Sequence, residues 1–375
     1  SWAWPYAFAM FPLQVGVNIL MLMGNKTNTF NADLWNVWGK IFTAFIVISV
    51  TTPIFGRGWS LALAFIIAAF QIVMELNAGD IHQHRIEKLT GIPSVTCTHR
   101  MVFFGAIYYP FDLLLRKIPV LNKPMDAAAL RQKVGVFAEN HTIGFLLGIM
   151  FGIIAGYSLA ATLMLGVQAA TALMLFPMIS KLFMQALSPI SEAISTYMNN
   201  KFSGRKLFIG IDWPFMGGAS EIWFAVIVAI PLTLVWAVIL PGNKILPFAG
   251  IINIALIVPA YLVTKGNTLR MVILSIIGIP FFLFVGTQFA PMITELGLAT
   301  KAINIPAGQL ISNSSIDGPV FTYAFSFLFK FLQGSFIPLL LAVFWACSYF
   351  FYAQELRKET AQETTSIEVN QVPEA

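Results

Sequence analysis

The chain has 375 residues, of which 58% are hydrophobic and only 10% are charged. Soluble domains carry charges at about a quarter of their positions, so this composition excludes an ordinary soluble protein and predicts a polytopic membrane protein. The net charge of +5 does not indicate nucleic-acid binding, because the basic residues lie between apolar segments. Cys97 and Cys347 are the two cysteines of the chain, and they have neither a disulfide framework nor metal-ligand spacing.

The chain begins with Ser1 and an apolar segment that has no basic n-region, so this segment is not a signal peptide and the natural start is expected upstream. The last apolar region, 320–352, is longer than one span and is expected to break near Gly334 or Pro338. We predict an all-α polytopic membrane fold with about eight to ten transmembrane helices plus re-entrant hairpins. The other apolar stretches long enough to cross, or nearly cross, the hydrocarbon layer are 5–23, 40–54, 59–76, 143–164, 166–180, 222–241, 248–263 and 271–289.

The Lys and Arg residues indicate the orientation. All of them except Arg57, Lys244, Lys301 and Lys330 lie in polar segments that we assign to the cytoplasm, namely 24–40, 77–101, 116–141, 181–206, 264–270 and the tail. This arrangement satisfies the positive-inside rule only if 102–115, which is short, does not cross. We therefore predict a re-entrant or interfacial piece at 102–115, a membrane-embedded domain at 1–352 and a polar, mobile cytoplasmic tail at 353–375.

A first polar cluster stands directly before an apolar helix. Glu139, Asn140 and His141 precede GFLLGIMFGIIAGY, and Gly144, Gly148 and Gly152 in and around this run permit close helix packing or a re-entrant hairpin. A carboxylate, an amide and an imidazole together suit the hydroxyl groups of a polyol, since they accept and donate hydrogen bonds. The alternative is a solvated loop end with Asn140 as a helix cap.

A second polar cluster precedes the last apolar region. Asn313 and Asp317 lie in SNSSIDGP, where Gly318-Pro319 breaks the backbone before a helix. Broken polar backbone in each half of a chain is typical of transporters with a site near the membrane midplane, so we predict that Glu139 and Asp317 approach one cavity. Two unrelated surface caps are the alternative.

The remaining polar candidates have simpler alternatives. Asp212 lies in GIDWPFMGGASEIWF before a span, where either a re-entrant turn or a turn at the membrane surface is expected. Asn243 lies in the Pro/Gly turn PGNKILPF, and turn chemistry alone explains this asparagine. The segment NADLWNVWGK, which contains Asp33 and Lys40, predicts an aromatic helix at the membrane surface. His82 and His84 are expected in a solvated loop. His99 follows Cys97, but no base or oxyanion donor accompanies this thiol, so we expect it to be inert.

The ordered series NADLWNVW, GIP, FAENHTIGFLLGIMFGIIAGY, FIGIDWP, PGNKILPF and KGNTLR resembles the galactitol family of enzyme IIC subunits. These are the membrane permeases of the bacterial phosphoenolpyruvate-dependent sugar phosphotransferase system. Glu139, Asp212, Asn243 and Gly318-Pro319 match the family pattern. The chain departs from it at Asn140 (family Pro), at Ser94 (family His) and at Gly218 (family His), and these departures affect the substrate more than the transport role.

The resemblance implies binding and transport of a sugar alcohol or related carbohydrate, with phosphorylation by a separate cytoplasmic enzyme IIB that works with enzyme IIA. It also implies no cofactor, a homodimer in the bacterial inner membrane, and further N-terminal spans. The residues leave two alternatives, an ion-coupled secondary transporter for sugars or organic acids and a membrane-embedded transferase. Uptake that requires phosphoenolpyruvate would distinguish a phosphotransferase permease from both alternatives.

Overall fold

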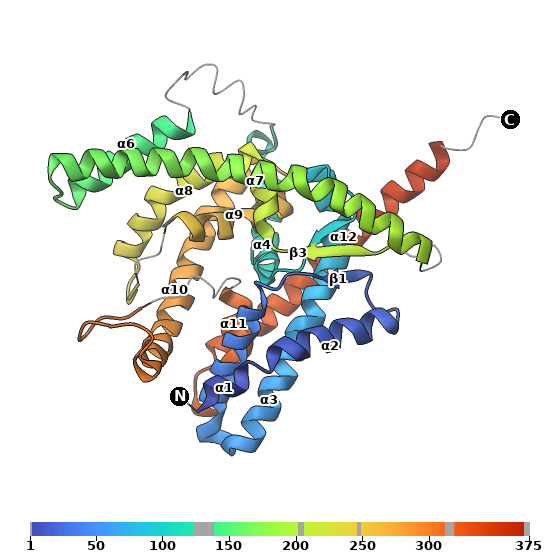
Figure 1. Cartoon of the computed structure of the whole chain (residues 1–375), viewed down its shortest axis with the longest axis horizontal. Helices are drawn as coiled ribbons and strands as arrows, with labels where there is room; N and C mark the ends of the chain where they lie inside the picture. Colours follow the sequence, from blue (N-terminus) through green and yellow to red (C-terminus); the bar gives the residue numbers. More distant parts are fainter. Residues whose placement is uncertain are drawn as a thin grey trace.

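A computed structural model describes residues 2–123, 135, 139–201, 206–245, 249–311 and 319–370. The chain is largely helical (Figure 1). Within the described ranges, six helices are long and apolar enough to cross a membrane, which confirms the prediction of a polytopic membrane protein. They are Ala3–Met23, Val37–Thr90, Leu159–Ile179, Glu221–Ile239, Thr268–Thr300 and Ile337–Gln362.

The N-terminal region contains the helices α1 (Ala3–Ala7) and α2 (Met10–Met23), followed by α3 (Val37–Thr90). The backbone of α3 is non-helical at Gly56, with φ 78° and ψ 172°, and the chain reverses there (Figure 1). The two predicted segments 40–54 and 59–76 are therefore the two limbs of α3.

The prediction of a solvated loop at 77–101 is wrong over 77–90, because the second limb of α3 continues to Thr90. Two of the polar side chains in this part of α3 contact other helices. His82 is fully buried, and its Nε2 lies 3.2 Å from the hydroxyl of Tyr352. Arg85 is also buried and donates to the carbonyl of Leu262. Hydropathy alone cannot distinguish such a polar helix from a loop.

The predicted span 143–164 is two antiparallel helices, α6 (Asn140–Ile154) and α7 (Leu159–Lys201) (Figure 1). Gly156 supports the turn between them with a φ of 70°. The predicted loop 181–206 is also wrong over most of its length, since α7 continues to Lys201. The hydropathy profile placed the break between the two helices after residue 164, because the actual turn, AGYS, carries no charge.

The predicted close packing at the glycines of α6 is confirmed. A Cβ atom added to Gly148 would lie 2.6 Å from the carbonyl oxygen of Leu165, and one added to Gly144 would lie 2.6 Å from that of Ala169. Neither backbone can yield without separating the helices. We expect Gly148→Leu to open the α6–α7 hairpin and to lower the thermal stability of the protein in detergent, while the same change at Gly58, which has open space around it, leaves stability nearly unchanged.

The second half of the chain is helical as predicted, with changes in length. The last apolar region breaks at Gly334, as expected, where φ is 84°. The final helix passes beyond 352 into the segment predicted as a mobile tail. The helices not yet described, in both halves of the chain, are α4 (Phe104–Leu115), α8 (Ser220–Ile239), α9 (Ala249–Thr264), α10 (Thr268–Thr300), α11 (Pro319–Ser326) and α12 (Ile337–Asn370), with short 3-10 turns at Arg100–Phe103, Pro119–Asn122, Trp213–Gly218 and Leu328–Gln333.

A small parallel sheet departs from the all-α prediction. Its strands are β1 (Thr29–Asn31), β2 (Val95–Cys97) and β3 (Phe208–Ile211), in the order β1-β3-β2. Gly210 lets β3 pass close to its neighbours, since an added Cβ would lie 2.3 Å from Thr98. Gly79 brings α3 against the sheet, where its carbonyl accepts from Thr96 Oγ1 at 2.6 Å.

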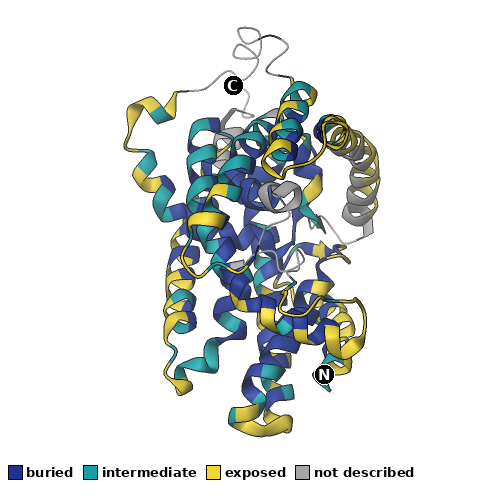
Figure 2. Ribbon diagram, turned by 90° about the vertical axis from the view of Figure 1, so that its left-hand side faces the viewer, coloured by how far each residue is buried: buried dark blue, intermediate teal, exposed yellow. Residues whose placement is uncertain are grey.

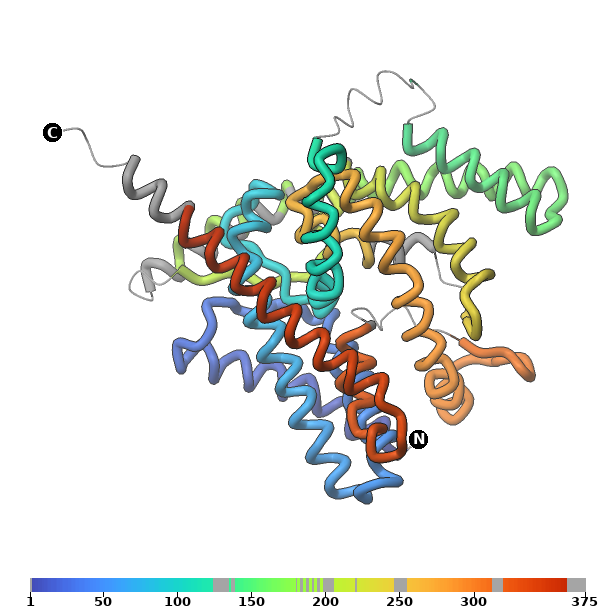
Figure 3. Tube along the Cα trace, turned by 180° about the vertical axis from the view of Figure 1, so that it is seen from behind, coloured from blue at the N-terminus to red at the C-terminus, as the bar shows by residue number. Residues whose placement is uncertain are grey.

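Buried residues fill the centre of the molecule and exposed ones line its periphery (Figure 2). Many exposed side chains are apolar, as a lipid-facing surface requires, for example Val238 at 81% and Met23 at 80% exposed. One apolar core joins α4, α8, α9, α10 and α12, and a second joins α1, the first limb of α3 and α11. Seen from behind, α12 crosses α3 (Figure 3), where Tyr349 donates to Asn77 at 2.9 Å.

Candidate functional site

The carboxyl ends of the three strands bring a carboxylate, an imidazole and a second carboxylate together. Asp33 follows β1, His99 follows β2 and Asp212 follows β3, and parallel strands end at the same edge of a sheet. One ligand atom from each of these residues lies within 4.8 Å of the others. Asp33 and His99 are buried, whereas the side chain of Asp212 is 26% exposed. The cluster is therefore mostly shielded but opens on the side of Asp212.

The backbone fixes the tautomer of His99. Its Nδ1 accepts a hydrogen bond from the N–H of Met101 at 3.2 Å, so the proton of the neutral ring belongs on Nε2. Nε2 faces a carboxylate oxygen of Asp212 at 3.9 Å. Burial, together with the charges of Arg100 and Lys40, holds the pKa of His99 well below its usual value. His99 is thus a neutral hydrogen-bond donor.

Asp33 has one carboxylate oxygen engaged and one open. Its Oδ1 accepts from the backbone N–H of Asn36 at 2.9 Å, which ties it to the start of α3. Among the described residues, its Oδ2 is one of the buried atoms without a hydrogen-bond partner. Burial raises the pKa of Asp33 to about 6, and the nearby charge of Lys40 opposes that rise. Asp33 is therefore ionised at neutral pH and has an acceptor available.

Two asparagines surround this carboxylate. The Oδ1 atom of Asn31 accepts from Thr98 at 2.9 Å and from the backbone of Asp33 at 3.0 Å, while Asn36 donates to the carbonyl of Thr98 at 3.1 Å. In the part of the chain that the structure describes, Asn31 Nδ2 and Asn36 Oδ1 are buried without a partner. Buried polar atoms are normally bonded, so these indicate a polar ligand or ordered water.

The chemistry of the cluster fits hydroxyl groups better than a metal ion. A metal would need the lone pair of His99 Nε2, and that nitrogen carries the proton because Nδ1 accepts from the backbone. A hydroxyl group both donates and accepts a hydrogen bond. It can donate to Asp33 or Asp212 and accept from His99 as the ring stands. A molecule with several adjacent hydroxyls matches this set of acceptors and donors.

A buried ion pair lies beside the cluster. Lys40 Nζ is 2.5 Å from Glu75 Oε2, and both side chains are completely buried. Gln71 donates to Glu75 Oε1 at 2.8 Å and accepts from Thr43 at 2.9 Å. Lys40 also donates to the carbonyl of Asn36 at 3.2 Å, which connects the pair to the strand-end cluster. The polar site thus continues from the sheet into the helix α3.

Glu75 lies deep along the second limb of α3, whereas Lys40 lies one turn after the start of the first limb. Glu75 is about 22 Å from the Thr90 end of the second limb and about 27 Å from its start at Arg57, taking 1.5 Å per residue. These lengths place Glu75 near the middle of a limb that is long enough to cross the membrane. Ionisable residues at such depth are costly and generally mark a site.

The residues predicted from the sequence lie in different places. Asp212 belongs to the strand-end cluster. Glu139 and His141 are exposed at the start of α6, where Asn140 is half-buried. Asn313 and Asp317 lie outside the described residues, and with them the predicted approach of Asp317 to Glu139.

Asn243 is held by its own turn. Its Nδ2 donates to the carbonyls of Ala237 and Ile245 at 2.8 and 2.7 Å, and its Oδ1 accepts from Thr287 at 3.0 Å. These bonds hold the turn after α8 and attach it to α10. The turn chemistry considered from the sequence therefore accounts for the polar atoms of this side chain.

The sequence reasoning missed Asp33, His99, Lys40 and Glu75 as site residues. A signal existed for one pair, because Gln71 and Glu75 are four residues apart in an apolar helix and so share one face. Asp33 and His99 had no such signal, since each follows a strand of three residues. Cys97 is buried in β2, and burial raises its pKa, so the thiol is held in its protonated form.

Comparison with known proteins agrees with the resemblance noted above. A family model described as "PTS system sugar-specific permease component" (EIIC-GAT) matches residues 1–308. The galactitol-specific EIIC components of Escherichia coli strains K12 and O157:H7 are each 29% identical over 326 residues, which cover 86% of this chain and 70% of the relative. A putative permease IIC component of strain K12 is 28% identical over 295 residues, 77% of this chain and 65% of the relative. The chain therefore belongs to the EIIC-GAT family of sugar-specific permease components of the phosphotransferase system, and it is a transport subunit.

Proposed function

We propose that this permease binds a sugar alcohol or a related carbohydrate at the strand-end cluster and carries it across the membrane. The single observation that supports this most is the neutral His99 donor placed beside the carboxylates of Asp33 and Asp212. Buried amide atoms of Asn31 and Asn36 without partners extend the same surface. The completely buried pair of Lys40 and Glu75 beside the cluster also supports a polar site inside the fold.

Phosphorylation is assigned to separate proteins. Components of this family work with enzyme IIA and enzyme IIB, and we propose that enzyme IIB phosphorylates the carbohydrate at the cytoplasmic side. The distribution of Lys and Arg supports a cytoplasmic C-terminus in the bacterial inner membrane. We also propose a homodimer, by the resemblance alone, and galactitol as the first substrate to test, by the printed names of two relatives.

The proposed function predicts that uptake depends on phosphoryl transfer. Membrane vesicles containing this chain are expected to accumulate labelled galactitol as its phosphate when phosphoenolpyruvate and the soluble enzymes, including enzyme IIB, are enclosed. A proton or sodium gradient alone should give no accumulation, since nothing then traps the product. Accumulation driven by the gradient without phosphorylation would contradict the proposal and support an ion-coupled transporter.

The same assay compares the two sets of candidate residues. Glu139, Asn140 and His141 stay a proposal as contacts at an entrance, because Glu139 and His141 are exposed. A tenfold or larger loss of uptake in Glu139→Gln, about the loss of one charge-assisted hydrogen bond, would support them. Unchanged uptake in this variant, together with a loss in Asp33→Asn, would restrict the binding site to the strand-end cluster.

A further inference from the structure

The helix α2 turns its polar side chains toward the protein and its apolar side chains outward. Gln14 and Asn18 are its polar residues, four positions apart and therefore on one face. They are only 2% and 3% exposed, whereas Leu20 and Met23 elsewhere on the helix are largely exposed. Burying an amide group is costly unless its atoms are hydrogen-bonded, so this face of α2 requires polar partners.

Both amide atoms of Asn18 are bonded to the sheet. Its Nδ2 donates to the carbonyl of Thr29 at 2.9 Å, and its Oδ1 accepts from the backbone N–H of Asn31 at 2.9 Å. β1 is an outer strand of the sheet, and an outer strand presents backbone groups that need partners. Asn18 therefore pairs with the edge of β1 as a neighbouring strand would, and it holds α2 on the sheet.

Gln14 is bonded through one of its two amide atoms. Its Nε2 donates to the carbonyl of Asp33 at 3.3 Å, which fixes the orientation of the amide and makes Oε1 the other polar atom. Among the described residues, Oε1 is buried without a hydrogen-bond partner. Because both atoms are attached to one carbon, Oε1 also lies beside Asp33. It adds an acceptor to the unpartnered atoms of Asn31, Asp33 and Asn36 already described.

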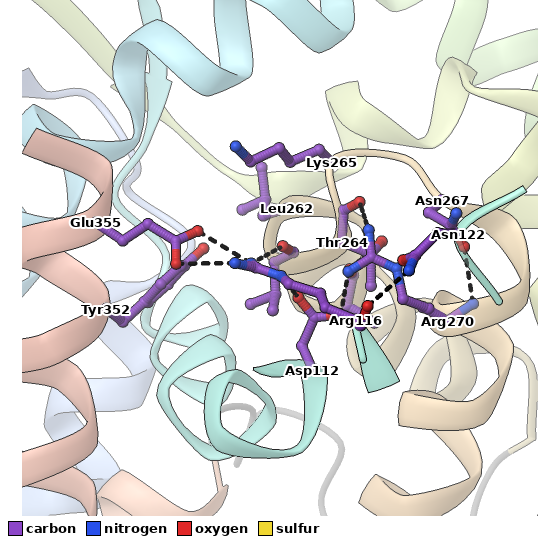
Figure 4. A network of polar contacts seen from close by, with 12 residues as sticks. Asp112, Arg116, Asn122, Leu262, Thr264, Lys265, Asn267, Arg270, Tyr352 and Glu355 are labelled. Atoms are coloured by element: carbon purple, nitrogen blue, oxygen red, sulfur yellow. Dashed lines mark hydrogen bonds and ion pairs between the residues drawn. The ribbon is translucent and has the colours of Figure 1, made fainter. Parts of the chain in front are cut away.

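Another buried polar network lacks such open acceptors. It joins α4, α10 and α12, and Asp112 lies at its centre (Figure 4). One oxygen of Asp112 accepts from Arg116 at 2.6 Å and the other from Arg270 at 2.7 Å, while both oxygens of Glu355 accept from Arg116 at 2.9 and 3.0 Å. With all four carboxylate oxygens bonded, this network holds helices together and offers no acceptor to a ligand.

We propose that Gln14 is a binding residue of the strand-end site, and that its Oε1 accepts a hydrogen bond from a hydroxyl group of the substrate. This inference rests on the proposed function, which places a carbohydrate at the cluster. The unpartnered acceptors are Oε1 of Gln14, Oδ2 of Asp33 and Oδ1 of Asn36. A hydroxyl group can donate to one of them and accept from Nδ2 of Asn31 or from His99. A ligand with several adjacent hydroxyls satisfies these atoms together, and α2 thereby takes part in its selection.

The contact can be tested with ligands that lack one hydroxyl group. Binding of galactitol and of its monodeoxy analogues is measured at equilibrium on the purified full chain in lipid nanodiscs. Gln14→Met keeps the length of the side chain and removes the amide. We expect it to bind galactitol about three- to tenfold more weakly, the loss of one neutral hydrogen bond. For the analogue that lacks the hydroxyl bound by Gln14, wild type and variant should bind equally.

Two variants of the same helix serve as controls. Leu20→Met introduces the same residue at an exposed position and should bind every ligand like the wild type. Asn18→Leu removes two bonds to the backbone of β1, so it should lower the thermal midpoint and weaken galactitol and all analogues by the same factor. This uniform loss is what a purely structural residue produces.

Two results would overturn the role of Gln14: unchanged affinity of Gln14→Met for galactitol, or an equal loss for galactitol and every analogue. A loss of binding by Asp33→Asn in the same assay would then show that the strand-end site stands without Gln14. If Asp33→Asn also binds normally, the proposed site fails as well. If the wild type prefers another hexitol, that hexitol and its monodeoxy analogues replace galactitol. Binding of no hexitol would refute the proposed function and this inference with it.

Discussion

Asp33→Asn is expected to weaken carbohydrate binding at pH 7 by about 10- to 100-fold. In the proposed site the wild-type carboxylate would accept hydrogen bonds from substrate hydroxyls as a charged group, and such bonds contribute about 1.5–3 kcal/mol. Asparagine keeps the shape of the side chain and can keep the bond from the N–H of Asn36. The loss of binding affinity should therefore come from Oδ2 of Asp33, which is buried without a hydrogen-bond partner among the described residues.

The pH dependence of binding follows from the pKa of Asp33, which burial raises from 3.8 to about 6. Above pH 6 the carboxylate is ionised and accepts from hydroxyls, so wild-type binding should strengthen between pH 5 and pH 7. In Asp33→Asn this increase should be absent. Equilibrium binding of labelled carbohydrate to the purified protein, measured across this range, tests both statements.

As the pH rises from 5 to 7, the stability of the wild type should fall while its binding strengthens. Because the folded-state pKa of Asp33 is raised, its favourable contribution is present below pH 3.8 and is lost as the pH rises through about 6. At pH 7 the wild type bears the cost of an ionised buried carboxylate, and Asp33→Asn should be more stable by up to about 3 kcal/mol. Glu295→Gln, at an exposed position of α10, is the control. A variant that loses both binding and stability would indicate a purely structural role for Asp33.

Lys40→Met is expected to produce the largest loss of stability among the changes considered. It leaves the carboxylate of Glu75 completely buried without its cation, and breaking a buried pair in this way costs about 3–5 kcal/mol. The thermal midpoint of the protein in detergent should fall by many degrees. It can be measured as the temperature at which the monodisperse size-exclusion peak is lost. Gln71 still donates to Glu75, but one neutral hydrogen bond does not replace an ammonium group.

Removal of the second charge should restore the fold. The double variant Lys40→Met/Glu75→Gln has no uncompensated charge, and neutral replacement of a buried pair is often nearly neutral for stability. If stability returns and carbohydrate binding does not, then the pair serves the site and the fold does not require it. If Lys40→Met alone is as stable as the wild type, the ion pair does not contribute to the stability of the fold.

The apolar helices were predictable because hydropathy reports directly on segments that face lipid. The span 222–241, for example, is found as α8 from Ser220 to Ile239. Reversals were harder to predict, since a turn inside the membrane needs no charged residue. Gly56 divides α3 between two predicted spans, whereas Gly156 separates α6 from α7 inside one predicted span. The glycine signal was the same, and only the flanking hydropathy differed.

The strand-end cluster could not be assembled from the sequence. Strands of three or four residues are too short to show the alternation that indicates a sheet, so Asp33 was interpreted as part of a surface helix and His99 as a companion of an inert thiol. Asp212 was selected because it precedes a span. What joined these residues was the parallel pairing of β3 with β1 (Thr29 with Phe208) and with β2 (Val95 with Ile209), segments more than a hundred residues apart, which follows from tertiary packing and not from any local pattern.

The order of the strands has a consequence for biosynthesis. β3 is the central strand of the sheet and the last of the three to be translated, so β1 and β2 have no partner in the sheet until residues 208–211 leave the ribosome. The salt bridge between Lys40 and Glu75 can form much earlier, because both residues belong to α3. A nascent chain that ends before Phe208 can therefore insert its first helices and neutralise its buried charges while it still lacks the site. The proposed binding site can therefore be complete only after β3 has been made.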